Sequence, residues 1–359
     1  MVTFARWYCR GADAERCTQG SYMDFRPIER TADAFQQSVT ADDIQAICQR
    51  VFGAHTRVVS ATELGAGMYN NTYRVAVVGQ ERPVILRVAP APDRQFRSER
   101  QLMRNEYASV PWLTSLAPMM PRVIAPDWSH EVIGRDYMVQ SLLDGVPARE
   151  RLGDYPRSTW PTFFRQMGAI ARDVHAVRGP CFGPVAGPAY ATWSQAVMAS
   201  LEDIAADLDS IGLNAADLRK VAAVAAQHHA VLDEITEPRM LSGDLWTVNV
   251  MLADGAPDPT ITGVLDMDRT WWGDPAADWT IRLARAKVGY RAGRVLGELW
   301  GPRLFPRRTM ALADLRSPSH RCYSLGAPPP GQRRRRTRHL RRYGRGAGQP
   351  ELTGPRRRF

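Results

Sequence analysis

Carboxylate and amide side chains gather in one short, mostly apolar stretch of the sequence. Asp244 follows a Ser-Gly pair, and Asn249 comes five residues later. Two apolar runs, Val248–Leu252 and Thr260–Leu265, flank a turn rich in glycine and proline, and this pattern predicts a β-hairpin. Asp266 stands where the second strand ends, so we expect the hairpin to bring Asn249 and Asp266 together near Asp244.

These residue types suit phosphoryl transfer. Mg²⁺ prefers oxygen ligands and is commonly held by one or two carboxylates together with phosphate oxygens. We therefore predict that Asn249 and Asp266 bind Mg²⁺. Asp244, outside the metal shell, would be free to orient and deprotonate a substrate hydroxyl, which is the layout of kinase sites. The alternative is an acidic hairpin on a solvated surface.

Three motifs in this region occur in a fixed order. They are Gly243-Asp244-Leu245-Trp246 followed by Asn249, then Leu265-Asp266, then Gly273-Asp274-Pro275 followed by Asp278. Together they resemble the aminoglycoside phosphotransferase family, whose relatives include choline kinase, fructosamine kinase and tuberactinomycin phosphotransferase. The resemblance implies that Asp244 is the catalytic base, and we expect Asp274 and Asp278 to brace its loop by accepting backbone hydrogen bonds. One departure is Ser242, where the family carries a histidine, and this puts the rigidity of the loop in question.

The resemblance covers roughly residues 41–287 and implies an α+β, two-lobed, protein-kinase-like fold. A small antiparallel β lobe with one helix would precede a larger, mostly helical lobe. The expected divisions are an ill-defined N-terminal extension at 1–40, a nucleotide-binding lobe at 41–143, a catalytic lobe at 144–287 and a tail at 288–359. Amphipathic patterns predict a helix capped by Thr40, a helix at 160–177 and a helix at 215–235.

Glycines mark a loop between two expected strands, Val58–Leu64 and Thr72–Val78. A lone Gly-x-Gly is more often a plain hairpin, but its place ahead of the other motifs favours a nucleotide-covering loop. The resemblance implies that ATP lies with its phosphates under this loop, near Gly65, Gly67 and Asn70.

An arginine takes the place of the usual kinase lysine. Arg87 lies in a β-rich run, and no lysine precedes Lys220. Glu106 lies within an apolar helical stripe, where a carboxylate needs a cationic partner, so we expect it to pair with Arg87; Glu99 is the second candidate. A capping box at Ser98 is expected to begin this helix. The resemblance further implies that main-chain groups near Gln140 and Leu142 hold the adenine.

Charge is unevenly distributed along the chain. Residues 288–359 hold 18 of the 47 basic residues and 3 of the 37 acidic ones, which leaves 29 basic against 34 acidic residues before them. The mildly acidic part favours a small cationic acceptor, such as an aminoglycoside or a tuberactinomycin, over nucleic acid. Choline, a sugar amine or homoserine remain alternatives, as does a catalytically impaired ATP-binding relative.

The ends of the chain carry separate expectations. The N-terminus lacks the apolar segment of a signal peptide and no long apolar run occurs, so we expect a cytoplasmic protein without a membrane span. Met23 is a candidate start. The arginine-rich tail has no apolar periodicity, which suggests a shifted reading frame beyond Lys287; the alternative is a disordered basic tail that binds nucleic acid or lipid. Oligomeric state is left open.

Overall fold

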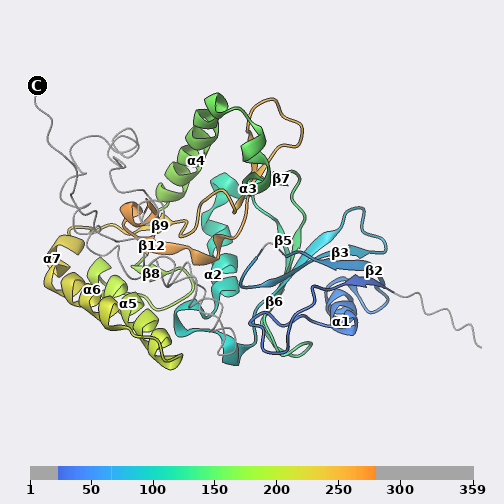
Figure 1. Ribbon diagram of the computed structural model, residues 1–359, viewed down its shortest axis with the longest axis horizontal. Helices are drawn as coiled ribbons and strands as arrows, with labels where there is room; N and C mark the ends of the chain where they lie inside the picture. The colour runs from blue at the N-terminus through green and yellow to red at the C-terminus, as the bar shows by residue number, and fades with distance from the viewer. Residues whose placement is uncertain (1–22, 66, 280–359) are drawn as a thin grey trace, which may run out of the picture.

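The first half of the described chain builds a six-stranded sheet (Figure 1). The structure is a computed structural model and describes residues 23–65 and 67–279. The strands are β1 (Asp24–Arg26), β2 (Val58–Glu63), β3 (Asn71–Val77), β4 (Val84–Val88), β5 (Val123–Asp127) and β6 (Tyr137–Ser141). They lie in the order β1-β2-β3-β4-β6-β5, and every neighbouring pair is antiparallel except β1 with β2. The predicted small antiparallel lobe is thus present.

Helix α1 (Ala41–Phe52) covers one face of this sheet. Thr40 caps it as predicted: its side chain accepts from the Asp43 amide at 3.1 Å, and the Asp43 side chain accepts from the Thr40 amide at 2.8 Å. Ile44 and Ile47 are fully buried against alternate residues of the strands, including Tyr73. Apolar residues recur about every 3.6 positions on the helix and at every second position on the strands, and both sets pack in one apolar core.

Helix α2 (Leu102–Ser109) lies between the sheet and the rest of the molecule. The expected capping box was wrong, because Gln101 adopts a left-handed conformation (φ 61°) and the helix begins only after it. Ser98 belongs instead to a separate 3₁₀ turn, Arg97–Glu99. The amides of Arg97 and Ser98 donate to the carboxylate of Asp207 at 2.7 and 2.9 Å. A contact with a distant helix therefore decides the local structure here.

The second half of the described chain is mostly helical (Figure 1). Its helices are α3 (Ala148–Arg151), α4 (Trp160–His175), α5 (Trp193–Ser210), α6 (Ala216–Gln227) and α7 (His229–Leu232). Two small sheets join them: β11 (Ile261–Val264), β10 (Val250–Leu252) and β7 (Val146–Pro147), and β8 (Gly183–Pro184), β12 (Trp271–Gly273) and β9 (Arg239–Leu241). The helix expected at 160–177 is confirmed, whereas the one expected at 215–235 divides at His228, whose ψ of 21° is not helical.

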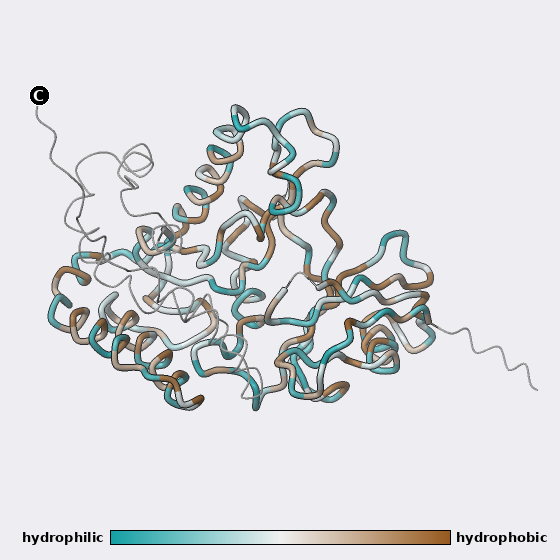
Figure 2. Tube along the Cα trace, in the orientation of Figure 1, coloured by the Kyte–Doolittle hydropathy of each residue, from teal (hydrophilic) through white to brown (hydrophobic). Residues whose placement is uncertain are grey.

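Hydropathy follows this packing. In Figure 2 the turns of α4 and α5 alternate between hydrophilic and hydrophobic colours, as expected for helices that bury one face. Phe163 and Val174 of α4 are fully buried with Val250 and Val264 of the β10–β11 hairpin. Within the described ranges, no helix is both long and apolar enough to span a bilayer. Residues 1–22, the tail at 288–359 and the suspected frame shift lie outside the described residues.

Candidate active site

The predicted hairpin forms and positions two of the candidate residues. Strands β10 and β11 are antiparallel, and the Leu265 amide donates to the Asn249 carbonyl at 2.8 Å. Asp266, the next residue, has a left-handed conformation with φ 60° and ψ 52°. This conformation is uncommon for a residue with a side chain, and it turns the chain at the end of β11.

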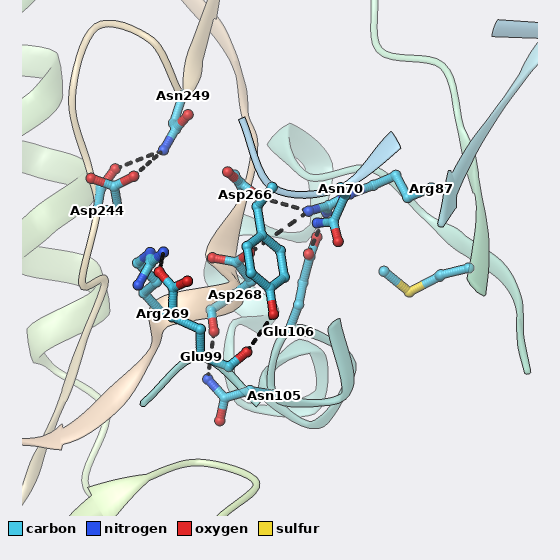
Figure 3. A network of polar contacts seen from close by, with 12 residues as sticks. Asn70, Arg87, Glu99, Asn105, Glu106, Asp244, Asn249, Asp266, Asp268 and Arg269 are labelled. Carbon is cyan, nitrogen blue, oxygen red and sulfur yellow. Dashed lines mark hydrogen bonds and ion pairs between the residues drawn. The ribbon is translucent and has the colours of Figure 1, made fainter. Parts of the chain in front are cut away.

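Asp244 and Asn249 lie in direct contact. The Asn249 Nδ2 donates to the Asp244 carbonyl at 2.9 Å and to its Oδ2 at 3.0 Å (Figure 3). Burial raises the pKa of Asp244 to about 6, and the charge of Asp266 adds to this effect, whereas Arg269 and the Asn249 hydrogen bond oppose it. Asp244 is therefore a stronger base than an ordinary aspartate.

A glycine allows the Asp244 loop to approach the segment after β11. Gly243 has φ 72°, and a β-carbon there would lie 1.9 Å from the Arg269 carbonyl oxygen. Only a residue without a side chain fits both the conformation and the space. The Gly-Asp pair of the motif is thus explained by backbone packing as well as by chemistry.

Asp278 braces this loop, as predicted. Its carboxylate accepts from the Ser242 amide at 2.8 Å, the Ser242 hydroxyl at 3.0 Å and the Gly243 amide at 2.8 Å. His175, at the end of α4, contacts the same carboxylate at 2.7 Å. Asp278 therefore supports the loop through hydrogen bonds to Ser242 and Gly243, although the family's histidine is a serine here. Asp274 accepts from the Ala276 amide at 3.0 Å.

Arg87 lies at the centre of a cluster of carboxylates (Figure 3). It pairs with Glu106 as predicted, and it also bonds to Asp266 at 2.6 Å and lies 3.9 Å from Asp268. Burial alone would lower the pKa of Arg87, but these three carboxylates outweigh it and raise the pKa. Burial raises the pKa of Glu106 and, more strongly, that of Asp268. The cluster concentrates charge where β4, α2 and the end of β11 meet.

Three further residues predicted to lie near the phosphates belong to the loop between β2 and β3. Asn70 is buried, and its Oδ1 has no hydrogen-bond partner among the described residues. Gly65 makes room for Ile28, because a β-carbon there would lie 3.0 Å from the Ile28 Cδ1. Gly67 has no such restriction, since the nearest atom to its β-carbon would be 3.7 Å away. A close approach of phosphate to these glycines stays a prediction.

The residues expected to hold the adenine lie at the end of β6. Gln140 is buried, and its side chain donates to Glu106 at 3.2 Å. Its side chain therefore supports the Arg87–Glu106 pair, a role that we did not expect from the sequence. Leu142 follows directly after β6. Adenine binding by main-chain groups here remains a prediction.

Two residues that the sequence patterns did not indicate make contacts at this site. Arg269 bonds to Glu99 at 2.8 Å and lowers the pKa of Asp244. Glu99, the second candidate for Arg87, is thus engaged elsewhere. Asn105 donates to the carbonyls of Asp268 and Thr270, both at 2.9 Å, and so fastens α2 to the segment after β11. The signal for Arg269 was its position three residues after Asp266; Asn105 carries none in the sequence.

Comparisons with known proteins bear on the family and the fold of the chain. A family model described as the phosphotransferase enzyme family matches residues 60–308. The structure is similar to that of a thermostable mutant of aminoglycoside phosphotransferase APH(4)-Ia in its apo form, with a TM-score of 0.53, 17% identity and coverage of 84% of this chain and 99% of that one. It is also similar to the GDP and kanamycin complex of APH(2")-IIia, with a TM-score of 0.52, 14% identity and coverage of 76% and 86%.

A comparison with curated protein sequences gives no match. The structural likenesses establish the fold, so the expected two-lobed, protein-kinase-like architecture is confirmed. The family match extends over most of the chain and covers the hairpin, Asp244 and the Arg87 cluster. The chain is a phosphotransferase and belongs to the phosphotransferase enzyme family.

Proposed function

We propose that this enzyme transfers the γ-phosphate of ATP to a hydroxyl of a small cationic acceptor, an aminoglycoside or a related antibiotic. The observation that carries most weight is Asp244, whose pKa is raised to about 6 while Asn249 holds it in place. A general base works best when its pKa lies near the working pH. Asp244 remains mostly ionised at neutral pH and binds a proton more readily than an ordinary aspartate.

In the proposed reaction these residues have separate roles. Asp244 accepts the proton of the acceptor hydroxyl, whose oxygen attacks the γ-phosphorus. The bond between that phosphorus and the oxygen shared with the β-phosphate breaks, and ADP leaves. Arg87 presents a planar guanidinium that can hold phosphate oxygens in pairs. Glu106 keeps this guanidinium in place, and Gln140 in turn holds Glu106.

Asn249 and Asp266 fit the expected Mg²⁺. Both hydrogen bonds of the Asn249 nitrogen go to Asp244, which leaves the Asn249 Oδ1 turned away from Asp244 (Figure 3). Asp266 adds a carboxylate, so the donor set is the oxygen set that Mg²⁺ prefers. Among the residues that the structure describes, no group of three or more His, Cys, Asp or Glu side chains is arranged to hold a metal ion, so the phosphate oxygens would have to complete the coordination. Bound Mg²⁺ would neutralise charge on the phosphates.

The nature of the acceptor is supported by charge. Before residue 288 the chain carries 34 acidic and 29 basic residues, which favours a cation. One similar structure contains kanamycin, a polyamine sugar of this kind. A small-metabolite kinase acting on choline, a sugar amine or homoserine is the second candidate. A catalytically impaired relative is less well supported, because Ser242 is fully engaged with Asp278.

Release of nucleoside diphosphate tests the proposal. Purified protein is incubated with Mg²⁺ and either ATP or GTP, because three similar structures contain GDP. The acceptors are aminoglycosides, tuberactinomycins, choline and homoserine, and the variants are Asp244→Asn and, as a matched control, Asp258→Asn, an exposed aspartate. We expect turnover that depends on an aminoglycoside and is lost only in Asp244→Asn. Turnover with choline or homoserine alone would favour the second candidate, and equal turnover in both variants would refute the role of Asp244.

A further inference from the structure

The segment between β1 and α1 contacts the loop that connects β2 to β3. We call residues 27–40 the N-terminal strap; it is part of the blue segment ahead of α1 in Figure 1. The family match begins only at residue 60, so the strap is not part of the matched region. Its contacts with the glycine loop add to the motifs already described.

A buried carboxylate anchors the strap. Glu63, the last residue of β2, has a side chain that is 0% exposed. It accepts from the Ile28 amide at 2.8 Å, from Arg30 at 2.8 Å and from the Ser38 hydroxyl at 3.2 Å. It also accepts from the Asn71 side chain, at the start of β3, at 2.8 Å. A buried carboxylate without hydrogen-bond partners would be costly, so these bonds to Glu63 stabilise the strap. They hold both of its ends at the base of the loop.

One strap side chain holds the loop itself. The Gln36 Nε2 donates to the Asn70 carbonyl at 2.9 Å and to the Gly67 carbonyl at 3.3 Å. Next to it, the rings of Phe35 and Tyr69 lie 5.6 Å apart. Gln36 thus binds the described part of the loop through two of its backbone carbonyls.

The opposite side of the loop is fixed to the turn before α2. The Tyr69 hydroxyl donates to the Glu99 carbonyl at 2.7 Å, and the Glu99 carboxylate bonds to Arg269. With Gln36 on one side and Glu99 on the other, Gly67–Asn70 has a defined conformation before any ligand binds. A loop ordered in advance loses less conformational entropy on binding.

We propose that Gln36 is a positioning residue that holds Gly67–Asn70 ready for the phosphates of the nucleotide. This inference rests on the proposed function, in which the glycine loop covers those phosphates. Gln36 contacts the loop through its backbone carbonyls, so it should affect ligands that carry phosphates and leave the binding of the nucleoside part unaffected. Loss of its two hydrogen bonds should weaken ATP binding about 5- to 30-fold.

The chain offers an isosteric variant and a matched control. Gln36→Glu keeps the shape and the oxygen near Arg30, which lies 3.4 Å from it, but cannot donate to the two carbonyls. Gln37→Ala alters the neighbouring glutamine, whose side chain has no hydrogen bond to the loop among the described contacts. Dissociation constants for ATP and for adenosine are measured for each protein. Amide hydrogen exchange of a peptide covering residues 64–72 is measured without ligand.

Three outcomes decide between the possibilities. We expect Gln36→Glu to speed exchange in the loop peptide and to weaken ATP but not adenosine, while Gln37→Ala changes neither. Unchanged exchange and unchanged ATP affinity in Gln36→Glu, with ATP bound by the unmodified protein, would overturn the role of Gln36. Failure of the unmodified protein to bind ATP would instead refute the proposed function, and with it the role of Gln36 in preparing the loop for phosphates. Amide hydrogen exchange would still show whether Gln36 holds the loop.

Discussion

Gly243→Ala should be far more damaging than an equivalent change at another left-handed glycine. Gly243 and Gly255 have φ of 72° and 68°, so alanine at either position adopts an unfavourable backbone conformation, at a cost of about 1–2 kcal/mol. Only at Gly243 does the new β-carbon collide, 1.9 Å from the Arg269 carbonyl oxygen, whereas at Gly255 nothing lies within 4 Å. Displacing packed backbone typically adds about 1–3 kcal/mol, so Gly243→Ala should lower the free energy of unfolding by that additional amount.

Urea unfolding of the two variants measures the difference directly, because the shared conformational cost cancels. Relief of this collision should also move Asp244 away from Arg269 and the segment after β11. A displacement of about 1 Å at a reacting group can reduce turnover about 100-fold, so phosphoryl transfer should fall in Gly243→Ala and remain in Gly255→Ala. Equal losses of stability in the two variants would refute the packing argument.

Three further changes test the charged groups. Folding raises the pKa of Asp244 from 3.8 to about 6, so protonation of Asp244 favours the folded state, and this stability is lost as the pH rises through about 6. The loss amounts to at most about 3 kcal/mol at neutral pH. Asp244→Asn should escape it, which denaturation of both proteins at pH 4 and at pH 7 measures. Asp278→Ala should lower the free energy of unfolding by about 3 kcal/mol or more, since several hydrogen bonds to one buried carboxylate are lost, and calorimetry showing a stable variant would contradict this. Arg87→Met should destabilise by about 3–5 kcal/mol because it leaves buried carboxylates unpaired, and Arg87→Lys by clearly less; equal unfolding midpoints for the two would argue against the cluster.

Local sequence patterns were sufficient where burial and period decide the structure. Thr40 and the apolar residues of α1 predicted a capped helix, and the structure shows both halves of the capping box. Glu106 was assigned to Arg87 because a carboxylate in an apolar stripe requires a cation, and the two side chains do pair. The hairpin was expected to bring Asn249 and Asp266 together near Asp244, and Asn249 does bond to Asp244.

Tertiary contacts decided the features that the sequence did not reveal. Ser98 has the residue types of a capping box around it, but Asp207 of α5 binds its amide and α2 starts later. Asp266 was expected beside Asn249, yet it also reaches Arg87 from a left-handed conformation that no local residue preference indicates. Gln36 gave no sequence signal, because its partners are backbone carbonyls in another segment.

The order of elements along the chain bears on how the molecule forms during translation. All six strands of the large sheet lie between Asp24 and Ser141, so this sheet can fold while the remainder is still being synthesised. The small sheet of the second lobe pairs Val146 with Leu252, and Arg87 meets Asp266 across 179 residues. Contacts of such long range form slowly. We therefore expect the cluster of Arg87 with its carboxylates to form late in folding, after the large sheet and the β10–β11 hairpin have formed.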